Sequence, residues 1–186
     1  MNSSFRRLMV TASAIASLFA GSAYAQVDLS KSTVSATSKQ MNVPTEGTFK
    51  KFTAQLDFDP ARPSAGSAKL SIDTASYDLG DESYNQQVRG KEWFDTAQFP
   101  NATFVSSAIA PAGGNQFKVS GTLTIKGKST NVTVPVTVTQ QGATQTFDGT
   151  LPIKRSQFDI GTGEWKDTSV VADEVLIKFH LVDMHK

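Results

Sequence analysis

The sequence contains no cysteine and only two histidines among its 186 residues. Disulfide bonds, thiol redox chemistry and cysteine-ligated metals are therefore excluded. A metal site needs several converging ligands, so His180 and His185 do not suggest one. His180 has the opposite parity to the apolar residues on either side of it, and His185 lies next to the last residue of the sequence. We therefore expect both histidines at the surface and no metal site.

The chain also has no excess of charge of either sign, with 18 Lys and Arg against 17 Asp and Glu. Without residues 1–25 it loses Arg6 and Arg7 and no acidic residue, which leaves it near neutrality. Binding to nucleic acid or to an anionic membrane surface generally requires a basic patch or a strong positive charge. We therefore expect neither of these partners.

The N-terminal residues have the pattern of an export signal. Arg6 and Arg7 precede an uncharged, mostly apolar stretch at 8–20, and Ala23 and Ala25 are small residues at the positions that a signal peptidase recognises. A membrane span needs about 20 apolar residues, which this stretch does not supply. We predict a cleavable signal at 1–25, cut after Ala25. The remaining 26–186 would be one soluble periplasmic domain with no stable membrane insertion.

Beyond residue 25, apolar and polar residues alternate over long stretches, as in half-buried β-strands. The clearest runs are 52–58, 70–72, 117–125, 132–138 and 175–181. Turns rich in Gly and Pro separate several of them, which predicts a meandering antiparallel sheet, closed into a barrel or folded into a sandwich. Pro135 lacks an N–H group, so we expect it on a sheet edge or at a bulge. Residues 80–100 interrupt the pattern, and we expect a short helix at 81–88 followed by an aromatic connection.

Several motifs, in this order and spacing, resemble those of the YceI-like family of exported lipid- or polyisoprenoid-binding barrels. They are G-x-F-x-x-F at 47–52, W-F-D at 93–95, P-x-A-x-F-x-S at 100–106, V-x-G-x-L-T-I-x-G at 119–127, and the segments 156–161 and 173–175. The resemblance covers essentially the whole chain after the signal. One departure is that many members carry R-D-x-H-L-R before the W-F-D position, whereas here only Asp81 corresponds and no histidine is present.

The resemblance implies an all-β fold: an antiparallel, lipocalin-like, up-and-down barrel of about eight strands. It also implies a long isoprenoid or acyl ligand, such as the tail of a quinone, held in an apolar tunnel. A single aromatic residue on an apolar face is more often a core residue than a ligand contact. Taken together with the resemblance, the apolar set favours a ligand-lined interior. The expected ligand-binding residues are Phe49, Phe52, Leu56, Phe58, Leu70, Ile72, Trp93, Phe94, Phe99, Phe104, Val119, Leu123, Ile125 and Phe158.

Catalytic motifs are scarce. No serine lies in G-x-S-x-G, and the adjacent carboxylates Asp173 and Glu174 would point to opposite faces of a strand. Asp81 and Glu82 suit the start of a helix, and 161–163 reads as a turn rather than a dinucleotide loop. We therefore expect a non-enzymatic protein that binds, stores or transports an amphiphilic lipid, with no cofactor other than a bound polyisoprenoid or quinone.

Two alternatives stay open at this point. One is a solid barrel that binds a protein partner through loops such as 80–91, and the less favoured one is a hydrolase. The sequence also leaves a homodimer open.

Overall fold

A computed structural model describes residues 25–184, so the predicted signal at 1–25 lies, except for Ala25, outside the described residues. These residues form one antiparallel sheet of 11 strands in the order β1-β4-β5-β7-β8-β9-β10-β11-β2-β3-β6. The strands are β1 (Ala25–Gln26), β2 (Thr33–Gln40), β3 (Val43–Phe49), β4 (Phe52–Asp57), β5 (Ser67–Asp73), β6 (Tyr77–Asp78), β7 (Asn101–Gly113), β8 (Gln116–Ile125), β9 (Lys128–Gln141), β10 (Thr144–Lys154) and β11 (Glu174–Met184). The helices are α1 (Glu82–Arg89) and the short 3₁₀ turns η1 (Pro63–Ala65), η2 (Thr74–Ser76), η3 (Arg155–Phe158) and η4 (Gly163–Lys166).

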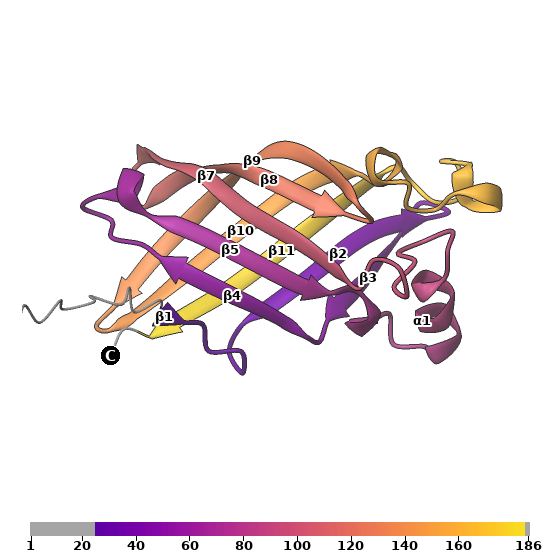
Figure 1. The fold of residues 1–186 in the computed structure, drawn as a ribbon, viewed down its shortest axis with the longest axis horizontal. Coiled ribbons are helices and arrows are strands. Elements are labelled where there is room, and N and C mark those ends of the chain that lie inside the picture. The colour runs from indigo at the N-terminus through magenta and orange to yellow at the C-terminus, as the bar shows by residue number, and fades with distance from the viewer. Residues whose placement is uncertain (1–24, 185–186) are drawn as a thin grey trace, which may run out of the picture.

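The sheet curls into an elongated barrel, and short segments join its edges at both ends (Figure 1). At one end, β1 pairs with β4, and the residues that follow it reach β11 through the Val27–Asp183 bridge and the Asp28 N to Val182 O hydrogen bond of 2.8 Å. At the other end, β6 pairs with β3. The end that carries α1 and the segment between η3 and β11, at the right of Figure 1, is called the mouth below.

The predicted alternation is confirmed in β4, β8 and β9, whereas burial in β5 and β11 does not alternate regularly. In β4, Phe52, Ala54 and Leu56 are buried, whereas the residues between them are exposed. All five residues of one parity in β8, from Phe117 to Ile125, are buried. In these strands, a period of two therefore places one apolar row in the barrel interior, where its removal from water stabilises the fold.

The predicted barrel class is confirmed, but the strand number differs slightly from the expected eight. β1 and β6 have two residues each, too few to show any alternation, and β3 has the sequence Val-Pro-Thr-Glu-Gly-Thr-Phe, which does not alternate. The helix expected at 81–88 is found at Glu82–Arg89. Its start is set by the carboxylate of Asp81, which accepts hydrogen bonds from the backbone N–H groups of Ser83 and Tyr84.

Pro135 lies, as predicted, on a part of β9 that pairs with a neighbouring strand on one side only. The pairing of β9 with β10 runs from Gln141 to Val136 and stops there, whereas its pairing with β8 continues through Pro135 to Lys128. The missing N–H group of proline is therefore at an edge, where it interrupts least. Among the described residues, no helix is long and apolar enough to cross a membrane.

Two glycines make room for aromatic rings inside the barrel. Gly149 of β10 is paired with Phe179 of β11, and a Cβ atom at Gly149 would collide with the Phe179 ring. Gly121 of β8 is paired with Ser106 of β7, and a Cβ atom there would collide with the carbonyl oxygen of Val105 and with the ring of Phe104. The rings cover the glycines and line the interior, so the shape of the interior depends on these two positions.

We predict that Gly149→Ala destabilises the protein by about 1–3 kcal/mol, because the added methyl group displaces the Phe179 ring in a packed interior. Thr150→Ala, one residue along on the exposed face, is the matched control and should cost less than about 1 kcal/mol. Urea denaturation followed by circular dichroism measures both. Equal free energies of unfolding for the two variants would contradict the close approach of Gly149 and Phe179.

Candidate functional site

An apolar cavity of about 140 Å³, the inner cavity, lies in the interior of the barrel. No charged side chain is among the described residues that line it. One water molecule needs about 10–15 Å³ by this measure, so the space takes a chain of about ten carbon atoms. Phe58 closes the end away from the mouth, with its ring centroid 4.9 Å from that of Phe117 and 5.6 Å from that of Phe147. The inner cavity therefore suits a hydrocarbon.

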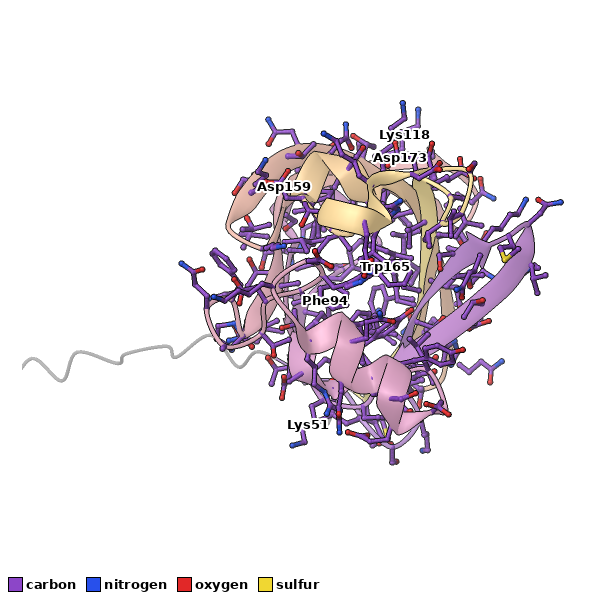
Figure 2. The ribbon with its side chains drawn as sticks, turned by 90° about the vertical axis from the view of Figure 1, so that its right-hand side faces the viewer. Lys51, Phe94, Lys118, Asp159, Trp165 and Asp173 are labelled. Carbon is purple, nitrogen blue, oxygen red and sulfur yellow. The ribbon has the colours of Figure 1, made fainter. Side chains whose placement is uncertain are left out.

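A second cavity of about 280 Å³, the outer cavity, lies at the mouth. The two cavities share Phe49, Phe94, Ile125 and Ile177, so they are adjacent along the barrel. Gln40, Tyr84 and Gln87 are exposed and also line the outer cavity, which is therefore accessible from solvent at this end. Figure 2 looks into the mouth and shows Phe94 and Trp165 near the centre, between α1 and the segment that contains η4.

Phe94 lies at the boundary between the cavities. Its ring makes edge contacts with Tyr77, at 5.7 Å between centroids, and with Phe49, at 6.1 Å. The Tyr77 hydroxyl donates a 3.0 Å hydrogen bond to the carbonyl oxygen of Ala36, and burial raises the pKa of Tyr77 to about 12. Tyr77 is therefore neutral at physiological pH. The passage from the outer to the inner cavity is thus aromatic and carries no charge.

Arg155 is the only residue with a charged side chain among the described residues that line the outer cavity. Its side chain is buried, and the guanidinium donates five hydrogen bonds of 2.7–3.1 Å to backbone carbonyl oxygens. A guanidinium has five N–H groups, so none is left for another acceptor. Burial lowers the pKa of Arg155, an effect that the nearby Asp173 partly offsets. The group stays charged, as arginine does in proteins.

The five carbonyl groups belong to residues of one segment, 160–172, which we call the strap. The strap covers one side of the mouth, and its amides at Gly161 and Thr162 also donate to the carbonyl oxygen of Glu92. Gly161 has φ +74°, and a Cβ atom there would collide with the Arg155 guanidinium. Only glycine meets both requirements without strain. Arg155 therefore organises the strap as a wall of the outer cavity.

Trp93 forms the adjoining wall. Its ring centroid is 5.6 Å from that of Trp165 in the strap and 6.0 Å from the Cζ atom of Arg155. The indole N–H of Trp93 is buried and has no hydrogen-bond partner within residues 25–184. A buried donor without an acceptor costs free energy. This N–H group is therefore a buried donor without a partner in the wall of the outer cavity.

Of the residues predicted from the sequence, ten line the inner cavity: Phe49, Leu56, Phe58, Leu70, Ile72, Phe94, Phe104, Val119, Leu123 and Ile125. Trp93 lines the outer cavity. The structure does not bring the remaining three, Phe52, Phe99 and Phe158, to either cavity. Phe52 is a buried core residue of β4, Phe99 packs against the Gly127 turn, and Phe158 is fully buried in η3. Whether the lining residues contact a ligand stays a prediction.

Sequence reasoning missed Arg155 and the strap. The alternation of the strand could have indicated Arg155. It follows the apolar residues Leu151 and Ile153 at intervals of two, which predicts that it faces the same, inner side. The strap residues are drawn from two turns and an extended segment with no periodicity, so nothing in their pattern indicated that they form a wall.

The candidate catalytic groups lie apart from both cavities. His180 faces outward, with its side chain 44% exposed, and its Nδ1 is 2.6 Å from Oδ1 of Asp148. Asp173 accepts hydrogen bonds from the backbone N–H and the hydroxyl of Ser156. No group of three or more His, Asp or Glu side chains that could hold a metal ion occurs in the described part of the chain.

Fold and site together define a single antiparallel β-barrel with an apolar interior that opens through a partly polar mouth. The sequence matches the model of the YceI-like domain over residues 26–182. The chain therefore belongs to the YceI-like family.

Relatives of known sequence agree with this assignment. Protein YceI of Salmonella arizonae is 31% identical over 128 residues, which are 68% of this chain and 64% of that protein, slightly less than two thirds of its length. A UPF0312 protein of Azotobacter vinelandii is 29% identical over 139 residues, 69% of this chain and 68% of that protein.

Solved structures agree as well. Burkholderia cenocepacia BcnA is 73% identical and superposes with a TM-score of 0.83, over 84% of this chain and 98% of that one. A polyisoprenoid binding domain from Saccharophagus degradans has a TM-score of 0.72 over 87% of this chain and 98% of that one. At 20% identity, this second likeness concerns the fold alone.

We predict that Arg155→Lys lowers the free energy of unfolding by about 3 kcal/mol, because an ammonium group has three donors and leaves buried carbonyl groups unpaired. Lys154→Ala, at the exposed neighbouring position, is the control and should change it by less than about 0.5 kcal/mol. Hydrogen exchange at the amides of Gly161, Thr162 and Ala172 should speed up in Arg155→Lys alone. Unchanged exchange there would contradict the role of Arg155 in holding the strap.

Proposed function

We propose that this protein binds an amphiphilic isoprenoid lipid with an uncharged polar head, such as a quinone, and stores or carries it without chemical change. The observation that carries the proposal is the pair of adjacent cavities, one lined almost entirely by apolar side chains, the other partly polar and accessible at the mouth. The family assignment and the polyisoprenoid-binding description of the Saccharophagus degradans domain support the same ligand class. An apolar cavity of this size inside the barrel argues against the alternative of a solid barrel.

The inner cavity would hold part of the apolar tail. Each buried methylene-sized group contributes about 0.8 kcal/mol, so one five-carbon isoprene unit contributes about 4 kcal/mol before the cost of ordering the chain. Two such units would provide useful affinity with no charged contact. The rest of a longer tail would extend past Phe94 into the outer cavity.

The outer cavity would hold the head. A phosphate or pyrophosphate head needs cationic donors, but the N–H groups of Arg155 are all bound to the strap. The Trp93 indole N–H can donate one hydrogen bond to a carbonyl or hydroxyl oxygen. The wall of the outer cavity therefore favours an uncharged acceptor over an anion.

We propose the periplasm as the site of action, on the basis of the signal pattern at 1–25. A lipid in an aqueous compartment between membranes needs a protein that keeps its tail from water. This gives the barrel a role as a carrier or reservoir, and no catalytic group is required for it.

The proposal is tested by extracting natively purified protein with organic solvent and analysing the extract by mass spectrometry. We expect an isoprenoid lipid, or uptake of ubiquinone when the protein is incubated with it. Leu123→Asp places a charge in the inner cavity and should abolish uptake or unfold the barrel. Thr122→Asp, on the opposite face of β8, should retain it. A protein that yields no lipid and takes up no quinone would overturn the proposal.

A separate prediction concerns the head. Trp93→Phe should weaken binding of a short-chain quinone by about tenfold, because one hydrogen bond is lost. Binding of a pure isoprenoid hydrocarbon of similar length should change little. Fluorescence titration with Trp165 as the remaining reporter measures both. An equal loss for the two ligands would show that Trp93 acts through packing rather than through its N–H group.

A further inference from the structure

Large apolar side chains are exposed around the mouth of the barrel. Four of the seven exposed large hydrophobic residues in the described chain lie there: Met41 (75% exposed), Val43 (63%), Tyr84 (53%) and Val170 (39%). They come from the β2–β3 hairpin, from α1 and from the strap, and we call them the apolar rim. The other three, Leu29, Val105 and Met184, lie outside the mouth. The hairpin, α1 and the strap gather at the right-hand end of the barrel in Figure 1.

The apolar rim is continuous with the outer cavity. Tyr84 belongs to both, and Met41 and Val170 directly adjoin the lining residues Gln40 and Val171. The hairpin and the strap are held together by the 2.8 Å hydrogen bond from Met41 N to Val170 O and by the bridge between Gln40 and Val171. Any surface that covers the apolar rim would therefore also face the opening of the cavity.

The tip of the hairpin has an unfavourable sequence for its conformation. Met41 and Asn42 both have positive φ, 48° and 66°. Two-residue hairpin turns of this kind favour Asn, Asp or Gly at both positions. Met41 therefore has an unfavourable backbone conformation. It is also the most exposed of the large apolar residues in the described chain, so its side chain does not contribute to the core.

We propose that the apolar rim docks on the surface of a phospholipid bilayer and so places the mouth against the membrane from which the ligand is taken. This rests on the proposed function, because an isoprenoid amphiphile resides in a bilayer and not in water. Four separated side chains around an opening, from three segments, would each insert at the interface while the ligand passes between them. Apolar side chains at an interface contribute to membrane binding in proportion to the area they bury.

The test uses ligand-free phosphatidylcholine vesicles and the purified protein in a flotation assay. We expect the wild-type protein to float with the vesicles. The double variant Met41→Asn, Val43→Thr should reduce the vesicle-bound fraction at least fivefold. Its thermal stability should be equal or higher, because Asn suits the turn. Neither residue lines a cavity, so uptake of a short-chain, water-soluble quinone should be unchanged. Leu29→Asn removes an exposed apolar residue beside the C-terminal end of β11, and it should float as the wild type does.

Several outcomes would overturn docking. One is a wild-type protein that takes up the soluble quinone but does not float, and another is equal flotation of the wild type and the double variant. Flotation only with anionic vesicles would show attraction by charge instead. A dimer in light scattering that the double variant dissociates would assign the apolar rim to a second copy of this chain. If the wild type floats but binds no quinone, docking stands and the proposed function fails.

Discussion

The mouth of this barrel depends on one buried cation. Arg155 stands at the end of β10 and gives all five of its N–H groups to carbonyl oxygens of the strap. Because those carbonyl groups would otherwise be buried without partners, the strap keeps a defined shape although η4 is its one regular element. The same bonds occupy every N–H group of the one cation among the described residues that line the outer cavity. A single side chain thus shapes the wall of the outer cavity and, under the proposed function, limits the kind of head group that could bind there.

The interior of the barrel contains an apolar cavity rather than a continuous packed core. Phe179 over Gly149 and Phe104 over Gly121 set how far aromatic rings reach inward, and Phe58, Phe117 and Phe147 close the far end. A cysteine-free domain has no disulfide to compensate for a hollow interior. Its sheet is instead joined at both ends, by Val27 and Asp28 beside β11 and by β6 beside β3. A ligand that binds only the folded barrel would add to that stability.

Much of the fold was predictable from the sequence, and the reason is local. In β4, β8 and β9, alternating residues face opposite sides of the sheet, so a pattern in the chain becomes a pattern of burial. The helix start at Asp81 and the edge position of Pro135 follow from the chemistry of single residues. The strands without alternation, β3 and the two-residue β1 and β6, were not predictable, because their pairing comes from partners distant in sequence. Phe52, Phe99 and Phe158 show the related limit: an apolar residue is predictably buried, but not predictably beside a cavity.

The sequence by itself determined that the chain is all-β, with one apolar face on each of its alternating strands, that it has no cysteine and that its charge is nearly balanced. These properties depend on composition and on neighbours one or two residues apart. Only the tertiary structure decided that the interior holds two adjacent cavities, that Arg155 is satisfied by the strap, and that Met41, Tyr84 and Val170 surround one opening. The cavities and the opening join segments tens of residues apart, and the strap folds back on Arg155 from 5 to 17 residues further along the chain. Such packing leaves no periodic trace in the chain.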